Sequence, residues 1–175
     1  KAGFVYSVEL DKDMIEVLSE TCKPWQSKIQ IIHKDALQLL KEDFCNKLPN
    51  KFVANLPYNI GATALLKVFE DFDFIDSATV MLQKEVVDRI MAVPGTKNYG
   101  AYTIKLALHS KAISKFLVKP NNFHPAPHVD SCVVRLNRVD TGLSPEQLSL
   151  CKKIINAAFA NRRKTLLNSA KSYLT

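Results

Sequence analysis

The segment Asn55-Leu56-Pro57-Tyr58 carries the residues of this chain that are best suited to chemistry. The Asn55 side-chain oxygen and the Leu56 carbonyl can each accept one N–H of an aromatic amine. Holding both hydrogens draws the nitrogen lone pair out of conjugation and directs it outward, toward a methyl donor. Tyr58 offers a flat face on which a base can stack. The competing interpretation is a turn punctuated by Pro57 that carries a tyrosine by chance.

Acidic residues stand at the predicted ends of the two strands that precede this turn. Glu9 comes near the end of an apolar run at 4–10, and Asp35 follows a second run at 28–33. The carboxyl edge of an open α/β sheet is where ligands bind. One carboxylate can accept both hydroxyls of a ribose and the next an adenine amine, so Glu9 and Asp35 suit an adenosine-containing cofactor. For either residue alone, a helix N-cap or a solvated turn is the alternative.

The elements that must position these residues follow from apolar periodicity. Strands and helices alternate, which predicts a parallel sheet covered by helices on both faces. The first helix, capped by Asp11, is expected to carry Met14, Ile15, Leu18 and Cys22 on one face. The expected strands are at 4–10, 28–33, 52–54 and 78–82, and the expected helices at 12–22, 62–70, 84–91 and from Gly100 to about Ser110.

The last part of the chain departs from this alternation. Strands at 112–118 and 129–138 have no helix between them, so they can pair antiparallel at the sheet edge. Ser144-Pro145-Glu146-Gln147 is a capping box that opens a further helix. We therefore expect an α/β core at 1–140 and the beginning of a small helical domain at 141–175.

Composition favours a polyanionic partner. The 175 residues carry a formal charge of +7, from 24 basic and 17 acidic side chains. The alternative for these basic runs is a solvated face. No apolar run is long enough to cross a bilayer. The four cysteines show no metal-ligand spacing, and His124 and His128 flank Pro125-Ala126-Pro127 in a loop where we expect no metal. The basic residues of interest are Lys105, Lys111, Lys115 and Lys119 in one series and Arg162-Arg163-Lys164 in a cluster.

Seven segments of the chain match the motifs of one family. Together they resemble the small-subunit ribosomal RNA adenine N6,N6-dimethyltransferases, the KsgA-type family, over essentially the whole length. The matching segments are Val8-Glu9-Leu10-Asp11, Lys34-Asp35-Ala36, Asn55-Leu56-Pro57-Tyr58-Asn59-Ile60, Met81-Leu82-Gln83-Lys84-Glu85-Val86, Tyr99-Gly100, Phe123-His124-Pro125-Ala126-Pro127-His128-Val129-Asp130-Ser131 and Asn161-Arg162-Arg163-Lys164-Thr165-Leu166.

The resemblance implies a class I, Rossmann-like methyltransferase fold and S-adenosyl-L-methionine as the methyl donor. Two adjacent adenosines near the 3′ end of small-subunit rRNA would become N6,N6-dimethyladenosine. Glu9 would hold the donor's ribose and Asp35 its adenine amine, with Ala36 and Leu37 lining the adenine pocket. Asn55 would contact both the donor and the target amine.

The resemblance also assigns the target base and the partner. Tyr58 and Phe123 would hold the flipped adenine between them, although Phe123 could instead plug the edge loop. The basic residues, with Lys105, Lys111 and Arg162-Arg163-Lys164 foremost, would bind rRNA. The expected protein is a cytoplasmic monomer that acts on the immature 30S subunit, without a membrane and without a metal.

Three departures from the family pattern bear on activity. The chain begins at Lys1 with a strand, without the family's first strand and Gly-rich donor loop, so we expect a fragment that is poorly able to bind the donor. Gly61 stands where relatives usually carry Ser or Thr. The helical domain stops at Thr175, short of the usual length. Two alternatives stay open: a 23S rRNA adenine methyltransferase of the macrolide-resistance type, and a non-catalytic RNA-binding ribosome-assembly factor.

Overall fold

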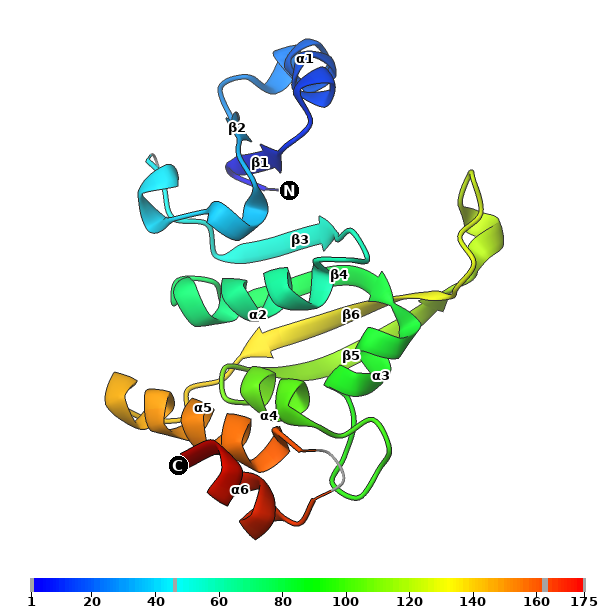
Figure 1. The fold of residues 1–175 in the computed structure, drawn as a ribbon. Coiled ribbons are helices and arrows are strands. Elements are labelled where there is room, and N and C mark those ends of the chain that lie inside the picture. Colours follow the sequence, from blue (N-terminus) through cyan, green and yellow to red (C-terminus); the bar gives the residue numbers. More distant parts are fainter. Residues whose placement is uncertain (1, 46, 162–163, 175) are drawn as a thin grey trace.

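The computed structural model describes residues 2–45, 47–161 and 164–174, and it contains two separate sheets in these residues (Figure 1). Strands β1 (Val5–Glu9) and β2 (Ile29–His33) form a parallel pair. The second sheet has the order β3-β4-β6-β5. Its strands are β3 (Lys51–Asn55), β4 (Ser77–Gln83), β5 (Ser110–Val118) and β6 (Ser131–Arg138).

Strand directions in the larger sheet agree with the sequence. Strands β3 and β4 are parallel, and β6 is antiparallel to both β4 and β5, as predicted for the last two strands. The helices are α1 (Lys12–Thr21), α2 (Gly61–Asp71), α3 (Lys84–Ile90), α4 (Ala101–Ala107), α5 (Pro145–Phe159) and α6 (Leu166–Leu174), with short 3-10 turns at Lys23–Trp25, Ala36–Gln38, Lys41–Asp43 and Pro120–Asn122.

The main core lies on one face of the four-stranded sheet. Helices α2, α3 and α4 lie on this face in Figure 1. Alternate strand residues point into it, as a strand's period of two requires. The buried strand residues are Ala78, Val80, Leu82, Cys132, Val134 and Leu136, and Leu65, Phe69, Val87 and Leu106 meet them from the helices.

The opposite face of this sheet is open, so the prediction of helices on both faces is wrong for the described residues. Strand pairing places Val53 and Phe116 on this face, where they are 76% and 62% exposed. The sequence misled because Phe52, Val53 and Ala54 form a continuous apolar run, which is typical of a strand buried on both sides. The helices that follow β3 and β4 lie on the same face, and α1 lies beyond β3 with the smaller sheet (Figure 1).

A second, aromatic cluster joins the smaller sheet to helix α2. Phe44 makes edge-to-face contacts with Tyr6 of β1 and with Phe72 after α2, at ring-centroid distances of 5.1 and 5.6 Å. Such pairs add to the free energy gained by burying their area. The cluster also buries Leu39 and Ile75. It is therefore the contact that fixes β1 and β2 relative to the main sheet.

Arg138 closes the end of helix α2. Its guanidinium donates to three backbone carbonyls, with Nε 2.7 Å from Ile75 O, Nη1 3.1 Å from Phe69 O and Nη2 2.6 Å from Phe72 O. The Phe69 carbonyl lies in the last turn of α2, where a helix leaves its C=O groups without internal partners, and Phe72 and Ile75 lie in the segment that follows the helix. One side chain at the end of β6 thus satisfies a helix end that is distant in sequence.

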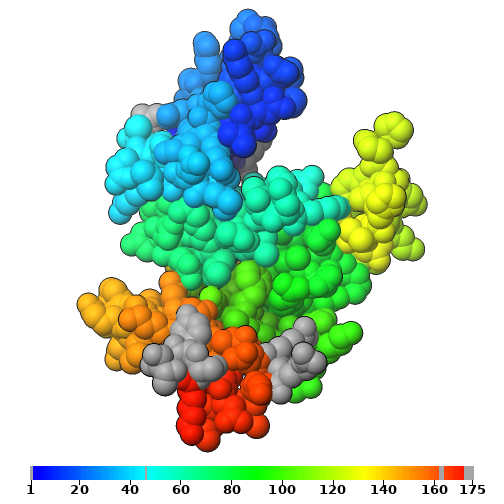
Figure 2. All heavy atoms as spheres, in the orientation of Figure 1, coloured from blue at the N-terminus to red at the C-terminus, as the bar shows by residue number. Residues whose placement is uncertain are grey.

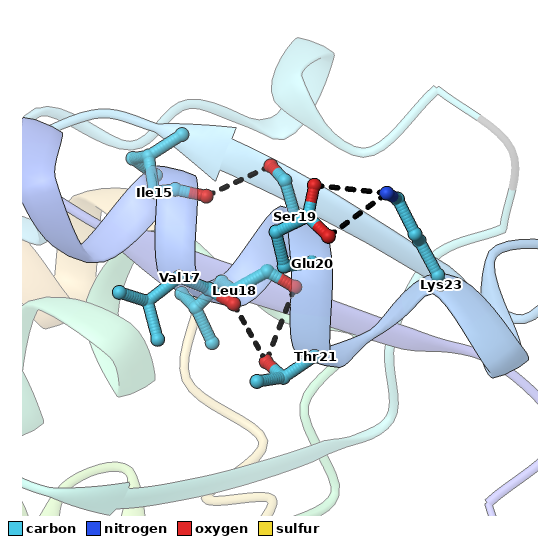
Figure 3. Close-up of polar contacts among 7 residues, drawn as sticks. All are labelled: Ile15, Val17, Leu18, Ser19, Glu20, Thr21 and Lys23. Carbon is cyan, nitrogen blue, oxygen red and sulfur yellow. Dashed lines mark hydrogen bonds and ion pairs between the residues drawn. The ribbon is translucent and has the colours of Figure 1, made fainter.

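Helix α1 begins as predicted but packs more loosely. Asp11 accepts the Asp13 N–H and caps the helix, yet α1 has no buried residue and Met14 is 44% exposed. On the apolar face of α1, Ile15, Leu18 and Cys22 are half-buried and Met14 is exposed. Polar contacts form at the C-terminal end of α1. The Thr21 hydroxyl donates to the Val17 carbonyl at 2.8 Å, and Lys23 forms an ion pair with Glu20 (Figure 3).

Helices α5 and α6 pack against each other at the end of the molecule remote from β1 (Figures 1 and 2). The predicted capping box at Ser144 and Gln147 is present, with Pro145 as the first helical residue. Lys152 of α5 lies 3.0 Å from Glu70 of α2, which ties the helical segment to the core. None of the described helices is both long and apolar enough to span a membrane.

Candidate active site

The Asn55-Leu56-Pro57-Tyr58 turn lies at the carboxyl end of β3, where the sequence placed it. Asn55 is the last residue of β3 and pairs with Met81. The Leu56 N–H extends this pairing by donating to the Met81 carbonyl at 3.2 Å, and the Leu56 side chain is buried. The Pro57 carbonyl then accepts the Gly61 N–H at 2.8 Å, at the start of α2. The turn is thus fixed to the sheet on one side and to a helix on the other.

This anchoring leaves the chemically useful groups at the surface. The side chains of Asn55, Pro57 and Tyr58 are exposed. The Tyr58 hydroxyl lies 2.8 Å from Oγ of Ser131, the first residue of β6. The turn therefore presents an amide oxygen and an aromatic ring at the edge of the sheet where ligands bind in α/β folds.

Glu9 and Asp35 come together at the carboxyl end of the smaller sheet. Glu9 pairs with His33, and the Lys34 N–H donates to the Glu9 carbonyl at 3.0 Å. Glu9 Oε1 accepts the N–H groups of Leu10 and Asp11 at 2.8 and 2.9 Å. Asp35 Oδ1 accepts the Leu37 N–H at 2.8 Å and caps a 3-10 turn.

Local hydrogen bonding, the alternative for these two acids, is therefore observed: Asp35 caps a 3-10 turn, and Glu9 binds the two N–H groups that follow it, although the N-cap of α1 is Asp11. It uses one oxygen of each carboxylate in the described contacts, Oε1 of Glu9 and Oδ1 of Asp35. A second oxygen on each group can still accept hydrogen bonds from a ligand. Ala36 packs beside the aromatic cluster and Leu37 beside the main core, both half-buried. Asn55 ends a strand of the other sheet, so the three residues lie at the carboxyl ends of successive strands as predicted, with the strands divided between two sheets.

Phe123 lies on the loop between β5 and β6. It follows the 3-10 turn at Pro120–Asn122 and is half-buried. The loop stands out from the body of the molecule (Figure 2). No ring contact links Phe123 to Tyr58 within the described residues. The structure thus does not bring the two rings together, and their joint action on one base remains a prediction.

The predicted RNA-binding residues have different surroundings. Lys111 of β5 and Lys164 are exposed, whereas Lys105 of α4 is half-buried. Arg162 and Arg163 lie outside the described residues.

Lys115, part of the same basic series, is paired. Its Nζ lies 3.1 Å from Asp88 Oδ1, and Lys84 contacts the other oxygen of Asp88. The hydrogen bond from Lys84, and then that from Lys115, hold the pKa of Asp88 below its ordinary value. This part of the surface is therefore less basic than the sequence suggests.

Two residues of the site had no role assigned from the sequence. Ser131 ends a matched segment, but nothing in the sequence shows that its hydroxyl reaches Tyr58. Gly61 is buried at the start of α2, where a Cβ atom would lie 2.5 Å from Leu82 Cδ2 and 3.3 Å from Leu56 Cβ. The sequence signal that could have revealed this close packing is the glycine itself, directly after the turn, because glycine is common where two packed elements approach closely.

Solved structures place this fold among methyltransferases. A dimethyladenosine transferase from Plasmodium falciparum has a TM-score of 0.80 and 26% sequence identity, and covers 96% of this chain and 59% of its own. The 23S rRNA methyltransferase ErmE has a TM-score of 0.66 and 22% identity over 97% of this chain and 66% of its own, a likeness of fold. The chain has a class I methyltransferase fold with an antiparallel β5–β6 pair at one side.

Sequence comparison then identifies the family. The family described as "Ribosomal RNA adenine dimethylase" matches residues 4–175, so the chain belongs to it. Ribosomal RNA small subunit methyltransferase A of Desulfotalea psychrophila is 37% identical over 175 residues, 98% of this chain and 59% of the relative. The protein of the same name from Listeria monocytogenes is 39% identical over 178 residues, 98% of this chain and 60% of the relative. The chain thus spans about three fifths of the length of these relatives.

Proposed function

We propose that the protein transfers methyl groups from S-adenosyl-L-methionine to the N6 amines of two adjacent adenosines near the 3′ end of small-subunit rRNA. The observation that carries this proposal is the anchored turn at the end of β3, which presents Asn55 beside Tyr58 in a member of the rRNA adenine dimethylase family.

The turn's chemistry follows from its hydrogen-bond acceptors. The Asn55 side-chain oxygen and the Leu56 carbonyl each accept one N–H of the target amine, which directs the nitrogen lone pair at the donor's methyl group. In-line attack by this lone pair would form the N–C bond as the donor's S–C bond breaks, and the amine proton would be released to solvent. Tyr58 stacks on the base. Orientation, and acceptors placed for the positive charge developing on nitrogen, provide the catalysis.

The methyl donor would be held at the carboxyl ends of β1 and β2. S-adenosyl-L-methionine supplies a methyl group on a positively charged sulfur when it is bound. The remaining oxygens of Glu9 and Asp35 suit its ribose hydroxyls and adenine amine, and half-buried Ala36 and Leu37 supply apolar surface beside Asp35. Asn55 would contact the donor from the other sheet.

The division into two sheets supports a further strand between them. Within the described residues β1 pairs only with β2, and β3 only with β4, so each has an unpaired edge. A parallel strand between these edges would make one continuous sheet and bring Asn55 to the same edge as Glu9. The relatives are long enough to supply such a strand.

RNA would bind through the exposed basic residues. Lys111 and Lys164 are exposed, and with Arg162, Arg163 and Lys105 they would contact rRNA phosphates. The proposed partner is the immature small ribosomal subunit, bound by a cytoplasmic monomer. The proposed core ends near residue 140, and the segment 141–175 would begin a helical domain.

The experiment compares Asn55→Ala with Asn50→Ala in the protein at the full length of its relatives. Asn50 lies just before the other end of β3 and contacts Asp76, so it is a matched control. Methyl transfer to unmethylated small subunits should be lost in Asn55→Ala and kept in Asn50→Ala, with RNA binding retained in both.

Other outcomes separate the alternatives. Transfer to protein-free 23S rRNA in place of small subunits would indicate an enzyme of the macrolide-resistance type. RNA binding without any transfer by the unmodified protein would indicate an assembly factor. Full activity in Asn55→Ala would contradict the proposed mechanism.

A further inference from the structure

The Tyr58 ring is tied to a distant strand through its hydroxyl group. Tyr58 Oη and Ser131 Oγ lie 2.8 Å apart, and 73 positions separate the two residues in the sequence. The Tyr58 side chain is 38% exposed, whereas Ser131 is 0% exposed. The contact therefore connects a ring at the surface of the candidate site to the interior of the sheet.

Ser131 is a rigid point of attachment. As the first residue of β6 it pairs with Gln83 of β4 on one side and with Val118 of β5 on the other. The neighbouring Asp130 carbonyl accepts the Lys84 N–H at 2.9 Å. Groups held on the strands of a sheet are positioned more accurately than groups on loops. The Ser131 hydroxyl is thus fixed relative to β3 and β4.

The Tyr58 backbone, by contrast, lies in a turn. The turn's described bonds are made by its neighbours, with Leu56 N–H donating to Met81 and Gly61 N–H donating to Pro57. A tyrosine ring has two side-chain torsions, and holding its hydroxyl oxygen restricts both. Without the Ser131 contact, no hydrogen bond described for Tyr58 would hold its ring in one orientation.

We propose that Ser131 is a positioning residue for methyl transfer, which holds the Tyr58 ring in the orientation that stacks on the target base. The inference rests on the proposed function, because it concerns the ring against which the base is aligned. Ser131 is buried and acts through Tyr58, without contact to the base. A ring fixed before the base arrives loses less conformational entropy on stacking and keeps the amine aligned with the donor.

The test removes each partner of the hydrogen bond while keeping the ring. In the protein at full family length, Ser131→Ala and Tyr58→Phe should each slow single-turnover methyl transfer about two- to tenfold, the effect of one lost hydrogen bond. Affinity for rRNA should change little, because phosphate contacts dominate it. The double variant should be no slower than the slower single variant, since both remove the same interaction.

Ser110→Ala is the matched control for a purely structural loss. Ser110 is also buried, and its hydroxyl donates to the Leu106 carbonyl at 3.2 Å, but it lies at the opposite end of the β5–β6 pair. It should lower the melting temperature without slowing transfer. The inference is overturned if Ser131→Ala keeps the full rate, if the two losses multiply, or if Ser110→Ala slows transfer equally.

The same experiments distinguish this inference from the proposed function. Loss of transfer in Asn55→Ala together with an undiminished rate in Ser131→Ala overturns only the role of Ser131. An undiminished rate in Asn55→Ala overturns the proposed function, and with it the premise of the inference.

Discussion

Gly61 and the buried side chain of Leu82 are packed so closely that a Cβ atom at residue 61 would lie 2.5 Å from Leu82 Cδ2. Leu82 is 1% exposed and belongs to the main core. The glycine therefore lets the first turn of α2 approach the end of β4. This contact gives a physical reason for the residue that departs from the family pattern.

We expect Gly61→Ser, which restores the usual residue type, to destabilise this protein by about 1–3 kcal/mol, because Leu82 must move within a packed core. Urea unfolding measures the change. The penalty should shrink in a Leu82→Val background, where the clashing group is smaller. Gly3→Ala is the control, since a Cβ atom at Gly3 meets nothing within 4 Å. Equal penalties in both backgrounds would show that the contact is unimportant.

The pairing of Tyr58 with Phe123 on one base can be tested by substitution. Tyr58→Ala and Phe123→Ala should each slow methyl transfer by the loss of one stacking face, about 1–3 kcal/mol. If the two rings hold the same base, the combined loss should differ from the sum. Single-turnover rates on unmethylated small subunits measure both effects. Small and strictly additive losses of rate would indicate that Phe123 only packs within the loop and does not contact the base that stacks on Tyr58.

The cluster Arg162-Arg163-Lys164 should contribute to RNA affinity. Replacing all three residues by glutamine should weaken binding and flatten its salt dependence by about one unit of logarithmic slope for each lost phosphate contact. Binding titrations at several salt concentrations measure the slope. The matched control replaces Lys12, Lys28 and Lys51, which are exposed and carry the same total charge. Equal slopes for the two triple variants would identify the cluster as a solvated surface.

His109 should make stability depend on pH. It is buried between α2, α5 and β6, where Glu70, Lys152 and Arg138 face it, and its Nε2 has no hydrogen-bond partner in the described part of the chain. Burial first, and then the charge of Lys152, lower the pKa of His109, while Glu70 opposes this shift. Protonation is therefore less favourable in the folded state than in the unfolded state.

The sign of the effect follows from proton linkage. As the pH falls through the unfolded-state pKa of about 6.5, the unfolded chain binds the proton first and the free energy of unfolding decreases. Stability should therefore be higher at pH 7.5 than at pH 5.5, and His109→Gln should reduce this difference. Urea unfolding at the two pH values measures it. A parallel decrease in both proteins would assign the effect to other groups.

Donor binding should distinguish the 175-residue chain from a longer form. We expect weak or absent binding of S-adenosyl-L-methionine by the chain, and clear binding by a form extended upstream by the family's first strand and Gly-rich loop. The reason is the proposed strand between β1 and β3, which would bring Glu9 and Asn55 to one edge. Calorimetry on both forms measures the affinity. Tight binding by the shorter form would contradict the need for this strand.

The sequence predicted local structure well because its signals are local. Asp11 and Ser144 cap their helices as expected, and Asn55 ends a strand. Burial was predicted less well, since it depends on which neighbours are present. Val53 and Met14 have the periodicity of buried residues and are exposed. The contact between Tyr58 and Ser131 could not be predicted, because it depends on a strand order that places β6 next to β4.

That strand order has a consequence for synthesis of the chain. β6 is made after β5 but lies between β4 and β5. Until residues 131–138 leave the ribosome, β5 has no partner strand and one edge of β4 stays open. The carbonyls of Phe69, Phe72 and Ile75 also lack their guanidinium donor until Arg138, the last residue of β6, has been synthesised. The four-stranded sheet is therefore complete only after β6, which joins β4 to β5, has been synthesised. A nascent chain that stalls before this point exposes an unpaired strand edge to other chains.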